Sequence, residues 1–139
     1  MKISARNMVA GKVTHVTKGA VNSEVTLTLQ GGENIVSIIT NSSVDSLGLQ
    51  DGLSAYAIIK ASDVMIGKGN GTKLSARNVL AGEVANLHDG AVNSEVEVRL
   101  AGGTPVIASI TKESVKALDL HQGDQVSAII KASHVLLGV

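Results

Sequence analysis

An internal repeat constrains this chain more than any other feature of its sequence. Three stretches recur with the same spacing of 71 residues: SARN at 4–7 and 75–78, GAVNSEV at 19–25 and 90–96, and AIIKAS at 57–62 and 128–133. No gap is needed to align them, and about half of the paired positions are identical. A chain of 139 residues that repeats itself in this way predicts two copies of one small module.

The copies are separated by a short polar segment that is rich in glycine. We expect a first module over residues 1–67, a linker over residues 68–73 and a second module over residues 74–139. The stretch GKGNGTK has the composition of a flexible connection. The sequence therefore predicts two tandem domains.

Each module has the pattern of a small all-β domain with one short helix. In the first copy, residues 21–32 alternate apolar and polar side chains and end at two glycines, which predicts a strand that runs into a turn. Residues 33–40, 53–62 and 62–67 are further β-rich stretches. A helix of about two turns can be capped by Thr40 or Asn41 in the first copy and by Thr111 in the second. This pattern predicts two five-stranded barrels of the oligonucleotide/oligosaccharide-binding type.

The core of such a module must consist of aliphatic side chains. The chain has no Phe or Trp and a single tyrosine, Tyr56, although 44% of its residues are hydrophobic. A module of this size that lacks large aromatic residues buries little surface. Tandem fusion and self-association both compensate for this, and we therefore expect a homo-oligomer.

Charge and composition exclude several classes of function. Twelve basic and twelve acidic residues leave no net charge, and one tyrosine cannot form a stacking platform, so we expect no binding to nucleic acid. The chain has no cysteine, which excludes disulfides and thiolate metal sites. None of the four histidines is repeated in the other copy, so we expect the histidines to lie on the surface and to form no metal site. No apolar stretch approaches the length of a membrane span, so we expect a cytoplasmic protein without membrane contact.

The polar residues that recur in both copies are mostly hydrogen-bond donors. They are Ser4/Ser75, Arg6/Arg77, Asn7/Asn78, Asn22/Asn93, Ser23/Ser94, Glu24/Glu95, Thr40/Thr111, Ser43/Ser114, Lys60/Lys131 and Ser62/Ser133. Donors without a carboxylate suit a tetrahedral dianion such as sulfate, molybdate or tungstate, which only accepts hydrogen bonds. Glu24 and Glu95 are interpreted as partners of a nearby Lys or Arg. The alternative is that the hydroxyls belong to turns and that the lysines are solvated charges on strand edges.

The order of these motifs resembles one known family. SARN, then GAVNSEV, then the short helix that begins with threonine, and then IIKAS are similar to the Mop module of the two-module molbindins, within the Mop/TOBE-like oxyanion-binding domains. The resemblance implies passive binding and intracellular storage of molybdate or tungstate by a homotrimer, with no cofactor and no enzymatic activity. The alternative is a protein that delivers molybdate to a partner protein or signals its level.

The resemblance also implies two classes of oxyanion site. The first class comprises Ser4, Ala5, Arg6, Lys60, Ala61 and Ser62, completed across a subunit boundary by Thr40 and Ser43, with the counterparts Ser75, Ala76, Arg77, Thr111, Ser114, Lys131, Ala132 and Ser133. The second class, near the threefold axis, comprises Gly19, Ala20, Val21, Asn22, Gly90, Ala91, Val92 and Asn93.

Two departures from the family pattern limit what the resemblance implies. We expect neither a DNA-binding segment nor an ATPase, so regulator and transporter roles do not transfer. Glu113 stands near one helix start, where a carboxylate weakens the binding of a dianion unless it points outward. The two modules are therefore expected to differ in affinity.

Overall fold

The computed structural model of the protein describes residues 1–69 and 73–139, so part of the expected linker at 68–73 lies outside the described residues. The first copy forms β1 (Asn7–Lys18), β2 (Asn22–Leu29), β3 (Asn34–Thr40), α1 (Asn41–Leu47), β4 (Ser54–Ile59), the 3-10 helix η1 (Ala61–Asp63) and β5 (Met65–Gly67). The second copy forms β6 (Asn78–Asp89), β7 (Asn93–Leu100), β8 (Pro105–Thr111), α2 (Lys112–Ala117), β9 (Gln125–Ile130), the 3-10 helix η2 (Ala132–His134) and β10 (Leu136–Gly138).

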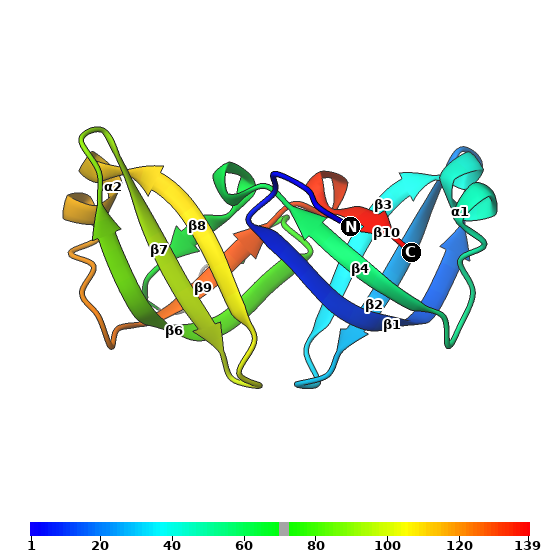
Figure 1. Cartoon of the computed structure of the whole chain (residues 1–139), viewed down its shortest axis with the longest axis horizontal. Coiled ribbons are helices and arrows are strands. Elements are labelled where there is room, and N and C mark those ends of the chain that lie inside the picture. The colour runs from blue at the N-terminus through cyan, green and yellow to red at the C-terminus, as the bar shows by residue number, and fades with distance from the viewer. Residues whose placement is uncertain (70–72) are drawn as a thin grey trace.

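The strands form two curled antiparallel sheets of five strands each, which confirms the expected fold class. Their orders are β10-β4-β1-β2-β3 and β5-β9-β6-β7-β8. The sheets lie side by side as two half-barrels, with α1 and α2 at the two outer ends of the molecule (Figure 1). In each sheet the two end strands approach each other, β10 toward β3 and β5 toward β8. Each sheet is therefore a partly open barrel.

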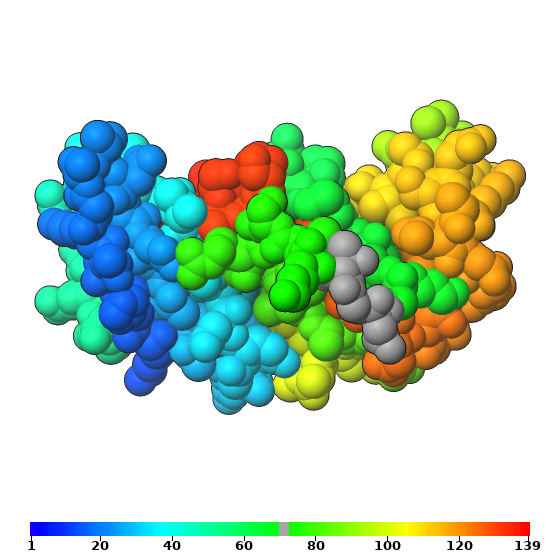
Figure 2. All heavy atoms as spheres, turned by 180° about the vertical axis from the view of Figure 1, so that it is seen from behind, coloured from blue at the N-terminus to red at the C-terminus, as the bar shows by residue number. Residues whose placement is uncertain are grey.

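The last strand of each copy belongs to the sheet of the other copy. β10 pairs with β4, and Leu136 lies opposite Ile58; β5 pairs with β9, and Met65 lies opposite Ile129. The C-terminal residues accordingly sit against the first half of the molecule (Figure 2). The repeat pattern does not predict this exchange, which makes each half-barrel depend on both copies.

The core is aliphatic, as the composition predicts. In β2 the side chains of Val25, Leu27 and Leu29 are buried and alternate with more exposed polar neighbours. The equivalent positions of β7 are Val96, Val98 and Leu100, which are also buried. Strands with this period bury one face of the sheet and leave the other face to solvent.

The first strand of each copy is longer than the short strands that the sequence predicts. β1 contains 12 residues, and its pairing with β2 shifts register between Val13 and His15. β6 has the same length and shifts between Val84 and Asn86. A β-bulge of this kind bends a strand and increases its twist. One long strand therefore curls far enough to pair with β2 along one part and with β4 along another.

Both α-helices begin at the expected threonines. The Oγ1 atom of Thr40 accepts a hydrogen bond from the N–H of Ser43 at 3.1 Å, and Thr111 accepts one from Ser114 at 3.1 Å. These contacts satisfy one of the amide groups that every helix start leaves unpaired. Among the described residues, no helix is long and apolar enough to cross a membrane.

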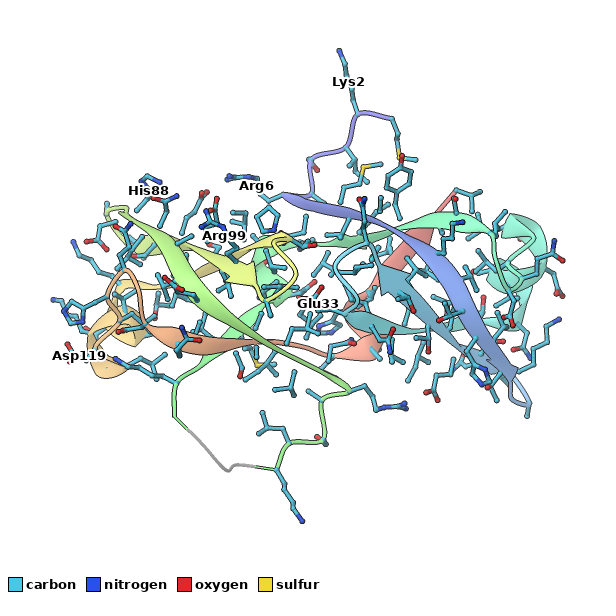
Figure 3. The ribbon with its side chains drawn as sticks, turned by 90° about the horizontal axis from the view of Figure 1, so that it is seen from below. Lys2, Arg6, Glu33, His88, Arg99 and Asp119 are labelled. Carbon is cyan, nitrogen blue, oxygen red and sulfur yellow. The ribbon has the colours of Figure 1, made fainter. Side chains whose placement is uncertain are left out.

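The β2–β3 and β7–β8 turns meet between the two halves. A Cβ atom at Gly31 would lie 2.7 Å from the Cα atom of Gly102, so the backbones approach too closely for a side chain. The carboxylate of Glu33 accepts a hydrogen bond from the N–H of Gly102 at 2.7 Å and lies between the halves (Figure 3). This contact has no copy in the second module, where Thr104 occupies the equivalent position.

Candidate functional site

The strand register brings the SAR and KAS motifs of one copy together. Asn7 begins β1 and pairs with Ile59 at the end of β4. The residues just before β1 and just after β4 must therefore be neighbours. They line a hollow of about 490 Å³, together with side chains from the other copy. From the first copy the site residues in this hollow are Ser4, Ala5, Arg6, Lys60, Ala61 and Ser62.

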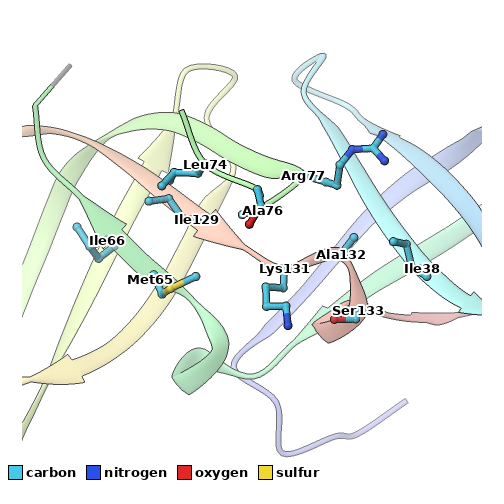
Figure 4. Close-up of a pocket in the computed structure, with 11 residues that line it drawn as sticks. Ile38, Met65, Ile66, Leu74, Ala76, Arg77, Ile129, Lys131, Ala132 and Ser133 are labelled. Atoms are coloured by element: carbon cyan, nitrogen blue, oxygen red, sulfur yellow. The ribbon is translucent and has the colours of Figure 1, made fainter. Parts of the chain in front are cut away.

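The second copy repeats this arrangement. Asn78 pairs with Ile130, and the adjoining motifs line a hollow of about 480 Å³ (Figure 4). The site residues in it are Ser75, Ala76, Arg77, Lys131, Ala132 and Ser133. The repeated motifs thus give each hollow one guanidinium, one ammonium and two hydroxyls, all of which can donate hydrogen bonds.

The other copy supplies one wall of each hollow. η1 packs against β8, and η2 packs against β3. As a result, Ser109 of β8 lines the first hollow, and Ile38 of β3 lines the second hollow at the equivalent position. The first hollow therefore has an additional hydroxyl where the second hollow has an aliphatic side chain. The residues that the two copies share do not predict this difference, because Ser109 and Ile38 are not among them.

The helix-start hydroxyls of the second copy lie beside the KAS motif of the first. Thr111 and Ser114 line a third hollow of about 560 Å³ that also contains Ser62, Asn93 and Ser109. Since Ser62 and Ser109 also line the first hollow, the two hollows share a wall.

Thr40 and Ser43 stand at the equivalent helix start of the first copy, directly after β3, which packs against η2. Among the described residues, Thr40 and Ser43 do not line the hollow of Ser4. The completion of this site by Thr40 and Ser43 of another subunit stays a prediction.

The residues expected to form the second class of site lie in the β1–β2 and β6–β7 turns. The N–H of Gly19 donates to the carbonyl oxygen of Asn22 at 2.8 Å, and Gly90 donates to Asn93 at the same distance. The side chain of Val21 at the tip is 70% exposed, and that of Val92 is 73% exposed. Of these residues, Asn93 alone lines the third hollow. Both turns thus present apolar side chains and backbone groups to the outside of the chain.

Each site arginine forms an ion pair with a glutamate of the other copy. Nη1 of Arg6 donates to Oε2 of Glu95 at 2.5 Å, and Arg77 donates to Glu24 in the same way. Arg6 reaches toward the strands of the second copy (Figure 3). These contacts confirm the interpretation of both glutamates as partners of a nearby cation.

The ion pair affects the titration of its members. The hydrogen bond from Arg77 lowers the pKa of Glu24 below its ordinary value of 4.5, and the positive charge of Arg77 acts in the same direction. The same hydrogen bond raises the pKa of Arg77. Both groups therefore carry full charge at neutral pH.

The histidines lie on the surface, as the sequence predicts. His15, His88, His121 and His134 are all exposed. His134 lies 3.6 Å from Asp63, and His15 contacts the hydroxyl of Thr17 at 2.8 Å. Within residues 1–69 and 73–139, no three His, Cys, Asp or Glu side chains gather as a metal site would require.

The fold and its hollows define a duplicated small-barrel protein with donor-rich sites at the boundary between its copies. A model of the TOBE domain matches the chain twice, over residues 3–66 and 74–137. The chain therefore belongs to the TOBE domain family and contains two such domains.

Named relatives share both copies or one of them. The chain is 42% identical over 139 residues to the molybdenum transport protein ModE of Azotobacter vinelandii, and this match covers 100% of this chain and 52% of that protein. It is 48% identical over 66 residues to molybdenum-pterin-binding protein 3 of Clostridium pasteurianum, and this match covers 48% of this chain and 97% of that protein. The chain spans about half the length of the Azotobacter protein. The Clostridium protein matches about half of this chain over nearly its own full length, so it has the length of one copy.

A solved structure matches the whole chain. It is that of the cytoplasmic molybdate-binding protein ModG with molybdate bound, with a TM-score of 0.97 and 46% sequence identity. The match covers 100% of this chain and 99% of that one. At this level of similarity the two proteins share the arrangement of both half-barrels.

Proposed function

We propose that this protein binds molybdate, and tungstate as its near-isostere, without catalysing a reaction. The observation that carries the proposal is the pair of matching hollows, each with a guanidinium, an ammonium and at least two serine hydroxyls. The relatives named for molybdenum and the molybdate-bound ModG structure support this ligand class. Its role is storage and homeostasis of the oxyanion in the cytoplasm.

The donors fit the chemistry of the ligand. Molybdate is a tetrahedral dianion at neutral pH, and its four oxygens only accept hydrogen bonds. Lys60 and Arg6 supply positive charge in the first hollow, and Lys131 and Arg77 supply it in the second. Hydrogen bonds between charged partners are about twice as strong as neutral ones, so these side chains dominate the affinity.

Self-association into a homotrimer completes the sites. In this arrangement Thr40 and Ser43 of one subunit close a first-class site of another, and the Gly19–Asn22 and Gly90–Asn93 turns form the second class. The exposed Val21 and Val92 side chains support an interface at these turns, because burial of apolar surface stabilises association. Glu113, in the first turn of α2, distinguishes the helix starts and makes the affinities of the two modules unequal.

Native mass spectrometry tests the ligand and the assembly together. The purified protein is titrated with molybdate and, separately, with sulfate. We expect a trimer that gains several molybdate ions and no sulfate. A protein that binds neither anion contradicts the proposed function, and a monomer that binds molybdate contradicts the assembly alone.

A further inference from the structure

The two arginine–glutamate pairs have the same arrangement in both halves of the molecule. In each pair an arginine of the SAR motif in one copy reaches the glutamate of GAVNSEV in the other copy. Glu95 also lines the first hollow together with Arg6 and Lys60. A carboxylate thus stands beside a group of donors that are suited to an anion.

Stability does not account for these pairs. The side chains of Arg6 and Glu95 are 53% and 42% exposed, and those of Arg77 and Glu24 are 50% and 36% exposed. Exposed ion pairs contribute little to folding, because water screens their attraction and both side chains lose conformational freedom. The presence of a matching pair at each hollow therefore indicates a role at the hollow itself.

The glutamate holds the guanidinium apart from the other cation of its hollow. In the second hollow Arg77 extends toward the strands of the first copy, and Lys131 points in a different direction (Figure 4). The guanidinium hydrogen-bonds Glu24 in this arrangement, so a donor that an oxyanion needs is already occupied. An anion that binds Arg77 must compete with this carboxylate.

We propose that Glu24 and Glu95 are displaceable counter-ions of the site arginines. This inference rests on the proposed function. When the oxyanion enters, the guanidinium exchanges its carboxylate partner for an oxygen of the ligand. The freed carboxylate turns to solvent, which its exposed position permits. The glutamates thereby offset part of the positive charge of the site and lower its affinity for a dianion.

The negative charge of each glutamate determines whether its removal strengthens or weakens the binding of molybdate. A carboxylate beside the hollow repels a dianion with twice the force that it exerts on a monoanion at the same distance. A glutamine at the same position keeps the shape and a hydrogen-bond acceptor but removes the charge. If the glutamates served only to position the arginines, their neutralisation would weaken binding instead.

The test compares molybdate affinity in the full-length protein by isothermal titration calorimetry. The variant carries Glu24→Gln and Glu95→Gln. A matched control carries Glu83→Gln and Glu97→Gln, which removes the same charge from the second copy at positions outside the hollows of Arg6 and Arg77. Circular dichroism verifies that both variants are folded.

We expect the first variant to bind molybdate about three- to tenfold more tightly than the wild type, with the control within about twofold of the wild type. Perrhenate, a tetrahedral monoanion of similar size, should gain less affinity than molybdate. Unchanged or weaker molybdate binding by a folded Glu24→Gln, Glu95→Gln variant overturns the inference while the proposed function stands. Failure of the wild type to bind molybdate contradicts the proposed function and the inference with it.

Discussion

The side-chain amide of Asn7 hydrogen-bonds both backbone groups of Ile107 in the other copy. Its Nδ2 atom donates to the carbonyl oxygen at 2.8 Å, and its Oδ1 atom accepts from the N–H at 2.7 Å. Asn78 makes the same two contacts with Val36, each at 2.8 Å. Both asparagines are buried, so the last residue of each SARN motif joins the two half-barrels.

Replacement of these asparagines should destabilise the protein. The change of Asn7 and Asn78 to alanine leaves the half-buried amide and carbonyl groups of Ile107 and Val36 without these partners. We expect each substitution to lower the free energy of unfolding by about 2–4 kcal/mol. Urea denaturation followed by circular dichroism measures the loss.

Asn86→Ala provides the control for this prediction, because Asn86 is an exposed asparagine on a strand of the same protein. It should change the free energy of unfolding by less than about 0.5 kcal/mol. Equal stability of Asn7→Ala and Asn86→Ala would show that the contact between copies contributes nothing.

The strand exchange predicts the behaviour of a single copy. In a fragment of residues 1–69, β4 lacks its partner β10, and β5 lacks its partner β9. Because β5 and β10 occupy equivalent repeat positions, a second fragment can supply the missing strand. We expect a dimer or a larger assembly by analytical ultracentrifugation. A folded monomer at micromolar concentration would contradict the requirement for exchange.

The sequence predicts the elements of the fold better than their pairing. The alternation of β2 and the threonine at each helix start depend on local chemistry, and both expectations are confirmed. The exchange is different, because Met65–Gly67 and Leu136–Gly138 satisfy the same hydrogen bonds with either β4 or β9. A repeat that is nearly symmetric contains no local signal that chooses between these partners.

The sequence likewise predicts some residues of the candidate site and not others. The proximity of Arg6 and Lys60 follows from the pairing of the strands that they flank, which a motif comparison captures. Ser109 enters the first hollow from the other copy, where its counterpart is Ile38. Comparison of shared residues cannot find a lining residue that the copies do not share.

Acid should destabilise the protein through carboxylates whose pKa is lowered in the folded state. The hydrogen bond from Arg77 lowers the pKa of Glu24, and that from Lys68, followed by the N–H of His121, lowers the pKa of Asp124 below 3.8. Such groups contribute stability that is fully present above their unfolded pKa values. This stability is lost as the pH falls through the lower folded values.

Thermal unfolding at a series of pH values measures this effect. We expect the melting temperature to fall below about pH 4.5, and to fall slightly less steeply in a variant with Glu24→Gln and Asp124→Asn, because water screens these solvent-accessible ion pairs and each contributes little. Near neutral pH the same variant should be slightly less stable than the wild type. An identical acid slope in both proteins would contradict the assignment of the pH dependence to these two groups.

The site arginines should be needed for molybdate binding but not for folding. Arg6→Ala together with Arg77→Ala removes one cationic donor from each hollow, and we expect at least a tenfold loss of affinity at the first-class sites, from about 1.5–3 kcal/mol per charged hydrogen bond. The assembly should persist, because the broken ion pairs are exposed. Calorimetry with molybdate and native mass spectrometry measure the two outcomes. As a control, Lys18→Ala with Arg99→Ala removes equal charge outside these hollows and should leave the affinity of the first-class sites unchanged. Undiminished binding at these sites by the Arg6, Arg77 variant would refute the assignment of both arginines as ligands.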